Sequence, residues 1–347
     1  MATFNAELQR DGPGLLLRDI LSGDDPKVIA AARLVVGIAP DILVLTGIDF
    51  DHDGHALAAF AAGLSALGHD YPHRFARQPN TGLPTGRDID GDGRANGARD
   101  AQGFGEFAGQ AGMAILSRHP IDTGGVRDFS AFLWADLPGA LIGDDPAADL
   151  QRLSTTAHWD VPVDLPGGMR VHILAYYATP PVFDGPEDRN GRRNHDETAF
   201  WTHYLDGTLS AASPPAAFVI AGDANLDPAD GDGRGAAMAA LLAHPRVQDP
   251  RPSSPEGAAR AARNGGVNAL HGGDPALDTA DWPDGPGGPG NLRVDYVLPS
   301  RDWRVADAGI AWPPSDSGLR HGLVWVDLLP EGAGDSDVDG GLDKIRR

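Results

Sequence analysis

Apolar residues occur along the chain in short runs and in spaced patterns, which predict strands and helices in turn. The compact apolar run at residues 42–45 is typical of a strand buried on both faces. Apolar positions spaced three and four apart from Val28 to Val36, after Asp25 and Pro26, predict a helix that ends near Pro40. Further strands are predicted at residues 3–8, 112–116, 171–176, 218–221, 293–298 and 323–328, and further helices at 55–67, around 197–209 and around 236–242. This alternation favours an α/β or α+β architecture.

Two long Gly- and Pro-rich stretches, residues 78–110 and 250–290, interrupt the pattern. Strand-like segments on both sides of them carry parts of one apparent site, so we interpret them as loop insertions and expect one domain over residues 1–330. The composition after Pro330 turns to Gly and Asp, which predicts a loosely attached acidic tail at residues 331–347.

Composition and charge exclude several classes of protein. The chain has 28 Lys and Arg against 49 Asp and Glu, a net charge of −21, and such a surface repels duplex nucleic acid. A small anionic substrate held by local arginines and a metal remains compatible with this charge. The chain has 0 Cys, which excludes disulfides, zinc–thiolate sites and thiol nucleophiles. No apolar run has the length of a membrane span, and 41% hydrophobic residues suffice for a buried core.

The segment around residues 218–225 carries the clearest chemical signal. An apolar strand delivers Asp223 and Asn225 to its carboxyl end, and strand alternation places both side chains on one side. Asp223 would orient or deprotonate a water molecule, and Asn225 would donate a hydrogen bond without adding charge. An Asx turn that shapes the following loop accounts for the same residues equally well.

Two later segments place an acid and a histidine in similar positions. Asp295 interrupts an apolar strand, where a charge is costly unless it is paired, and His321 immediately precedes another strand. A pair between these side chains would fix the imidazole tautomer and raise its basicity. A lone His at a strand start is usually structural, so it is the order of the three segments that indicates a site.

In that order the segments resemble the endonuclease/exonuclease/phosphatase superfamily of metal-dependent phosphoesterases. The resemblance covers about residues 3–328, and its matching elements are Thr3-Phe4-Asn5, the strand at 112–118, Gly222-Asp223-Ala224-Asn225, Asp295-Tyr296 and His321. It implies a four-layer α/β sandwich, with two β-sheets packed face to face and helices outside.

The chain departs from the pattern of that superfamily at three places. Thr46-Gly47 stands where the superfamily has Gln-Glu, Tyr176-Tyr177 where it usually has Thr-His, and Arg320 where it has the Asp before the final His. The first and third departures each remove a carboxylate that the resemblance leads one to expect.

The resemblance implies in-line attack of water on phosphorus. Asp223 would activate the water and Asn225 steady it, while His321, held by Asp295, and the phenol of Tyr177 would bind phosphoryl oxygens. Mg²⁺ or Mn²⁺ is the expected catalytic cation. Its predicted ligands are Asn5, Glu7 and Asp49.

An arginine-rich run, read as a loop, offers phosphate-binding groups. The candidates are Arg189, Arg192, Arg193 and His195. The alternative is a solvated loop whose arginines pair with local acids.

Calcium is a second possible cofactor, with a structural or a catalytic role. Asp88, Asp90 and Asp92 stand at alternate positions closed by Gly, with Asn96 further on, as in an EF-hand-type loop. Asp51 and Asp53 belong to a second copy, and residues 335–340 form a third. Asp-Gly turns that arise from composition are the alternative. Weak calcium loops fill where calcium is plentiful, which favours a periplasmic or secreted protein trimmed of a leader over a cytoplasmic one.

Together these features predict a metal-dependent hydrolase of phosphomonoesters or small phosphodiesters, with a small phosphorylated molecule as its partner. Two alternatives stay open. One is an extracellular nuclease, and the other is a non-catalytic calcium- or ligand-binding protein on a degenerate phosphoesterase scaffold.

Overall fold

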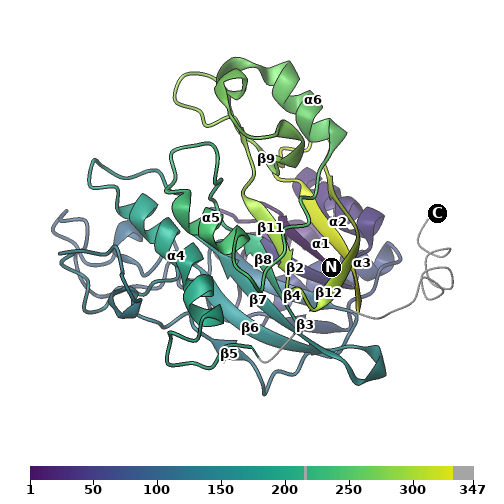
Figure 1. Cartoon of the computed structure of the whole chain (residues 1–347), viewed down its shortest axis with the longest axis horizontal. Coiled ribbons are helices and arrows are strands. Elements are labelled where there is room, and N and C mark those ends of the chain that lie inside the picture. The colour runs from purple at the N-terminus through teal and green to yellow at the C-terminus, as the bar shows by residue number, and fades with distance from the viewer. Residues whose placement is uncertain (215–216, 331–347) are drawn as a thin grey trace.

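The computed structural model describes residues 1–214 and 217–330, and the strands in this part of the chain form two main sheets (Figure 1). The six-stranded sheet has the order β12 (Trp303–Ala311), β13 (Leu323–Pro330), β1 (Ala2–Asn5), β2 (Ile42–Ile48), β4 (Gly112–Ser117) and β3 (His73–Phe75). The five-stranded sheet has the order β11 (Asp295–Pro299), β8 (Phe218–Asp223), β7 (Arg170–Tyr177), β6 (Ala157–Asp164) and β5 (Arg127–Asp128). A small ribbon joins β9 (Ala280–Asp281) and β10 (Asn291–Leu292).

Helices cover the outer faces of both sheets. On the six-stranded sheet lie α1 (Leu15–Ser22), α2 (Pro26–Ile38) and α3 (His55–Ala66), and on the five-stranded sheet lie α4 (Arg189–Leu205) and α5 (Ala236–Leu242). Helix α6 (Pro255–Asn264) projects beside β9 at the top of the view in Figure 1. The sequence of layers is therefore helix, sheet, sheet, helix, and the predicted four-layer sandwich is confirmed.

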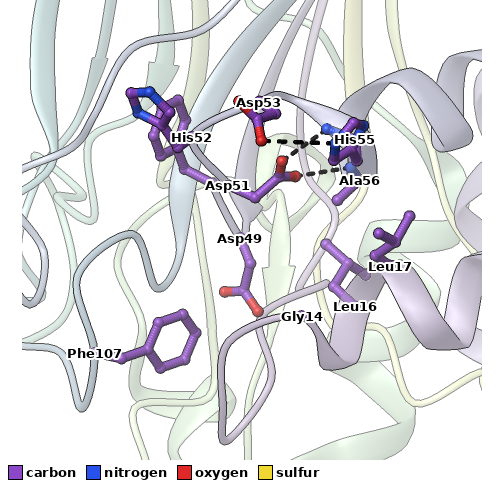
Figure 2. Close-up of a pocket in the computed structure, with 11 residues that line it drawn as sticks. Gly14, Leu16, Leu17, Asp49, Asp51, His52, Asp53, His55, Ala56 and Phe107 are labelled. Carbon is purple, nitrogen blue, oxygen red and sulfur yellow. Dashed lines mark hydrogen bonds and ion pairs between the residues drawn. The ribbon is translucent and has the colours of Figure 1, made fainter.

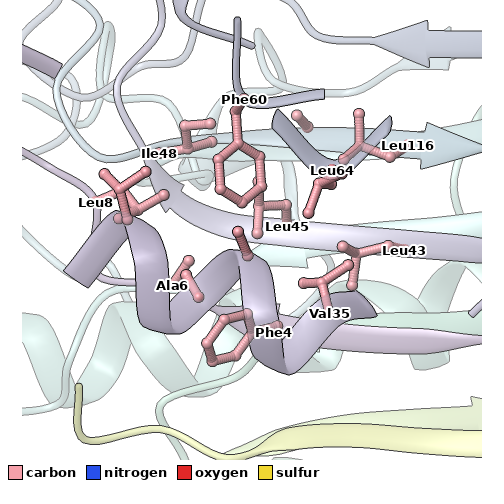
Figure 3. Packing of buried hydrophobic residues seen from close by; sticks show 14 of the residues in the cluster. Phe4, Ala6, Leu8, Val35, Leu43, Leu45, Ile48, Phe60, Leu64 and Leu116 are labelled. Carbon is pink, nitrogen blue, oxygen red and sulfur yellow. The ribbon is translucent and has the colours of Figure 1, made fainter. Parts of the chain in front are cut away.

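Three apolar clusters hold the layers together. The cluster between the two sheets includes Val44, Trp159 and Val219, and each of these side chains is fully buried. Figure 3 shows the second cluster, in which Phe60 of α3 packs among side chains of the six-stranded sheet such as Leu45 and Ile48. A third cluster lies between the five-stranded sheet and helices α4 and α5. Burial of strands on both faces explains why their apolar runs are continuous rather than alternating.

The strands and helices predicted from the sequence are present, but several of them begin or end at other residues than predicted. The strand predicted at residues 3–8 stops at Asn5, because Glu7 has a φ of +47° that extended backbone does not adopt. The arginine run at residues 188–195, predicted as a loop, instead forms the first turns of α4. Elements that the pattern did not predict include α1, α6 and β12.

Residues 331–347, predicted as an acidic tail with a third calcium motif, lie outside the described residues, so the division into domain and tail stays a prediction. None of the helices in the described part of the chain combines the length and the apolar character that a bilayer span requires.

Candidate functional site

The two sheets bring strand ends from both halves of the chain to one place. In the five-stranded sheet, Asp223 of β8 lies between its register partners Tyr177 of β7 and Asp295 of β11. The end of β1, in the other sheet, supplies Asn5, whose amide Nδ2 donates to Asp223 Oδ2 at 2.9 Å. The predicted residues Asn5, Tyr177, Asp223 and Asp295 are therefore neighbours.

Two glycines make this approach sterically possible. At Gly222 a Cβ atom would lie 1.9 Å from the Tyr176 carbonyl oxygen, and at Gly47 one would lie 2.3 Å from Asn5 Oδ1. Both have positive φ, 149° and 68°. Gly47 stands where the superfamily has Glu. Strand β2 therefore supplies no carboxylate to the site at this position.

Asp295 and His321 form the predicted buried pair. His321 Nδ1 lies 2.8 Å from Asp295 Oδ2, and the two residues are 3% and 1% exposed. Thr279 donates to the same oxygen at 2.9 Å and accepts the backbone N–H of Asp295. Sequence reasoning missed Thr279, because it lies in the Gly- and Pro-rich stretch and carries no motif.

The electrostatics of the site follow from burial and from the two acids. Burial and the charge of Asp295 raise the pKa of Asp223 to about 7. Burial alone would lower the pKa of His321, but the charge and hydrogen bond of Asp295 outweigh it and raise that pKa to about 9. Asp295 thus favours the protonated form of both neighbours, the imidazolium of His321 and the carboxyl group of Asp223.

Asn225 occupies a tight turn. Its backbone N–H donates to Asp223 Oδ1 at 2.8 Å, which is the Asx turn considered above, and its φ is +47°. Its side-chain amide donates to the Ala178 carbonyl oxygen at 3.0 Å. The turn is therefore present, and contact of Asn225 with a water molecule stays a prediction.

Glu7 pairs with Arg320. Nε of Arg320 donates to Glu7 Oε1 at 2.8 Å, Nη2 donates to the same oxygen, and the Arg320 backbone N–H donates to Oε2 at 2.5 Å. Glu7 is 3% exposed in its side chain, whereas the Arg320 side chain is 49% exposed. The arginine that departs from the superfamily pattern thus brings a fixed positive charge to the rim of the site.

Asp49 lies in a different environment. Figure 2 shows it in a pocket with Asp51, His55 and Phe107. Its two oxygens accept the backbone N–H groups of Arg10 and Ala111, each at 2.9 Å, and burial raises its pKa to about 6 despite these bonds. Asp49 therefore stabilises the loops around it.

The predicted cation ligands do not fit a divalent metal as arranged. Both Glu7 oxygens are bonded to Arg320, both Asp49 oxygens to backbone amides, and Asn5 Oδ1 accepts the Glu7 N–H at 3.1 Å. A Mg²⁺ ion requires open oxygen ligands in octahedral geometry. The guanidinium of Arg320 also repels a cation from Glu7.

A second group, Asp223, Asp295 and His321, places one donor atom of each residue within 4.8 Å of the others. Asp223 accepts hydrogen bonds at both oxygens, while Asp295 Oδ1 is buried without a partner in the described residues. One open oxygen, beside an imidazole whose Nδ1 is already bonded to Asp295, is a poor site for a hard cation.

The four residues of the predicted phosphate grip lie along α4 and contact the protein. Arg193 is 4% exposed and donates to backbone carbonyl oxygens, including that of Leu153 at 2.9 Å. Arg189 pairs with Asp145 at 2.7 Å, Arg192 donates to the carbonyls of Leu141 and Ile142, and His195 contacts Asp196 at 2.9 Å. These contacts anchor the helix, and substrate binding by the four residues stays a prediction that the geometry does not favour.

The calcium motifs have separate outcomes. Asp88, Asp90 and Asp100 place oxygens within 4.8 Å of one another, so Asp100 joins the group in place of the predicted Asp92 and Asn96. In the second copy, the oxygens of Asp51 cap helix α3 by accepting the N–H groups of His55 and Ala56, and Asp53 lies 3.8 Å from His55. Calcium binding at either copy stays a prediction.

Comparisons with solved structures agree with the overall fold. An endonuclease/exonuclease/phosphatase protein from Beutenbergia cavernae DSM 12333 is 22% identical with a TM-score of 0.56, over 96% of this chain and 71% of that one. A second, from Bacteroides vulgatus, is 12% identical with a TM-score of 0.50, over 95% of this chain and 98% of that one. A search of curated proteins found no match.

The sequence model that describes the Endonuclease/Exonuclease/phosphatase family matches residues 2–325. This match covers nearly the whole chain, from the strand that carries Asn5 to the strand that follows His321. The chain therefore belongs to the endonuclease/exonuclease/phosphatase family, whose members are generally hydrolases and commonly use divalent metals.

Proposed function

We propose that this protein hydrolyses phosphoesters of small molecules by attack of water on phosphorus. The observation that carries the proposal is the buried Asp295–His321 pair beside Asp223, assembled from three separate strand ends. A buried carboxylate, imidazolium and carboxyl group without a catalytic or binding task would cost stability that apolar residues would not.

Each side chain has a defined task in this proposal. Asp223, with its pKa raised to about 7, accepts the proton of the attacking water, and Asn5 orients its carboxylate. His321, held by Asp295, donates a hydrogen bond from Nε2 to a phosphoryl oxygen and offsets its negative charge. Tyr177 lies partly exposed beside Asn5, and in this proposal its phenol donates a hydrogen bond to a phosphoryl oxygen.

One observation favours a second candidate function, a binding protein without turnover. Asp223 has 0% exposed surface, so substrate and water reach it only if neighbouring groups move. The family allows both outcomes, because fold does not determine activity.

Hydrolysis assays separate the two candidates. We expect turnover of p-nitrophenyl phosphate or bis-p-nitrophenyl phosphate by the wild-type protein, tested without metal and with Mg²⁺, Mn²⁺ and Ca²⁺ in turn. His321→Ala should abolish this turnover, whereas His203→Ala, at a half-buried position on α4 where the ring contacts Thr208, should not. A folded wild-type protein that hydrolyses neither ester nor a panel of natural phosphomonoesters would support the binding protein.

A further inference from the structure

The side chain of Arg320 is held by Glu7 and is also partly exposed to solvent. Two of its guanidinium nitrogens bond Glu7, and its own backbone N–H closes the contact on the other Glu7 oxygen. Its carbonyl oxygen accepts the N–H of Asp281 at 3.0 Å, and the next residue bridges to Ala280, so the backbone is fixed on both sides. A side chain tethered in this way loses little conformational freedom when it binds a ligand.

The open part of the guanidinium faces outward. The Arg320 side chain is 49% exposed although Glu7 is 3% exposed, and Nη1 donates to no protein group in the described residues. If the only role of Arg320 were to neutralise Glu7, the buried ion pair would be enough and the guanidinium would not need an exposed part. The remaining donor is available to an acceptor that arrives from solvent.

Other donors lie around the same carboxylate. Asn5 links Glu7 to Tyr177, because it accepts the Glu7 N–H and donates to the Tyr177 hydroxyl, and His321 follows Arg320 directly in the chain. The Tyr177 hydroxyl accepts from Asn5 at 3.4 Å, and neither its own hydrogen nor Nε2 of His321 has a protein acceptor in residues 1–214 and 217–330. An anion with several oxygens matches this set, since guanidinium, phenol and imidazolium are all donors.

The same features exclude a divalent cation from Glu7. Position 47 is a glycine and supplies no carboxylate, and the guanidinium already occupies Glu7. We propose that Arg320 binds the phosphoryl group of the substrate. Its guanidinium, which lies beside Glu7 and Asn5, supplies the positive charge that metal-containing relatives obtain from a divalent cation. This inference rests on the proposed function for its substrate class, but anion binding itself does not depend on turnover.

Binding of inorganic phosphate tests the proposal without catalysis. Titration calorimetry in EDTA should show phosphate binding to the wild-type protein. Arg320→Ala should weaken it by about tenfold or more, and Arg320→Lys, which keeps the charge but not the forked geometry, should be intermediate. Arg118→Ala, at an exposed arginine paired with Asp41, is the matched control and should bind phosphate as the wild type does. Thermal unfolding of each variant verifies the fold.

Metal binding provides an independent second readout. Paramagnetic resonance of Mn²⁺ should show that Arg320→Ala gains a binding site relative to the wild type, because Glu7 is released. The gain should disappear in the double variant with Glu7→Gln. Wild-type phosphate binding that is absent in EDTA, or that is unchanged in Arg320→Ala, overturns the proposal.

The outcomes for the two proposals are distinguishable. Phosphate binding that depends on Arg320, in a protein without esterase activity, supports this inference while the hydrolase proposal fails. Esterase activity whose KM does not rise in Arg320→Ala, together with unchanged phosphate binding, supports the hydrolase and overturns this inference.

Discussion

Asp223 is fully buried, yet its pKa of about 7 leaves it partly ionised at neutral pH. The cause is the balance between burial and Asp295, which disfavour its charge, and His321, which favours it. A general base works best when its pKa lies near the working pH. In the proposed mechanism, the ionisation of this one carboxyl group therefore decides whether the site can activate water.

Asp223→Asn tests that role, because the amide keeps the shape and loses the base. We expect turnover to fall by a factor on the order of 10² to 10⁴, with a melting temperature near or above that of the wild type since a buried acid is removed. Steady-state kinetics and calorimetric melting are the two measurements. Turnover within twofold of the wild type would show that another group activates the water.

The elements of the fold are stabilised by local signals that are visible in the sequence. Asp25 caps α2 by accepting the Val28 N–H at 2.9 Å, and Pro26 occupies the first position of that helix. The segment that precedes α6 has the same form, because Ser254 caps the helix and Pro255 begins it. Both helices thus begin as sequence rules state.

Removal of the cap on α2 should be measurable. Asp25→Ala should lower the free energy of unfolding by about 1 kcal/mol, since the Val28 N–H loses its acceptor and Arg10 loses an ion pair. Asp24→Ala is the matched control, because the neighbouring Asp24 does not cap the helix. Urea denaturation with equal losses in both variants would contradict this assignment.

The loop that contains Asp88, Asp90 and Asp100 allows a test for calcium. We expect Ca²⁺ binding to stabilise the folded protein by mass action and so to raise its melting temperature. At a Ca²⁺ concentration 100 times the dissociation constant, the gain in the free energy of unfolding is about 2.7 kcal/mol. Asp90→Asn should remove this increment, while Asp92→Asn, whose carboxylate accepts the Arg94 N–H outside the group, should keep it. Identical melting of the wild type in Ca²⁺ and in EDTA would exclude this site.

The sequence predicts those parts of the fold and site whose signals are local. The strands that carry Asp223 and Asp295 are apolar runs of their own, and the order of motifs indicated their common site. Helix α6 carried the Ser254-Pro255 signal but lay within a stretch dominated by Gly and Pro. Helix α1 is preceded and followed by glycines, Gly14 and Gly23, and has no side-chain cap, so its pattern was too short to recognise.

The ion pair between Glu7 and Arg320 was not predictable in this way. The two residues are 313 positions apart, and the positive φ of Glu7 turns its side chain away from the direction that a continued strand would give. The register of β1 against β13 decides their contact, and register is a property of the assembled sheet. The same holds for Asp49, whose partners Arg10 and Ala111 come from different loops.

At the scale of the whole molecule, buried ionisable groups link stability to pH. His158 lies on β6 with its ring against α4, where Nε2 donates to the Glu197 carbonyl at 2.8 Å and Nδ1 accepts from Ser154 at 2.7 Å. Burial lowers its pKa from 6.5 to about 4. In that pH interval the unfolded chain binds a proton that the folded protein does not.

His158→Gln should therefore change the pH dependence of unfolding. The stability that neutral His158 contributes is complete above pH 6.5 and falls as the pH drops towards about 4, by about 1.4 kcal/mol per pH unit. Glu197, whose burial raises its pKa to about 7, acts in the opposite direction, so the difference between wild type and variant is the quantity to measure. Parallel curves of unfolding free energy from pH 7.5 to 4.5 would contradict the buried neutral histidine.

The joining of Glu7 to Arg320 also has a consequence during protein synthesis. Glu7, just after β1, is made 313 residues before Arg320, the partner that supplies its counter-charge. While these residues are being made, the Glu7 carboxylate has no counter-charge from Arg320. The Glu7–Arg320 ion pair therefore cannot form until residues 7–320 have all been made.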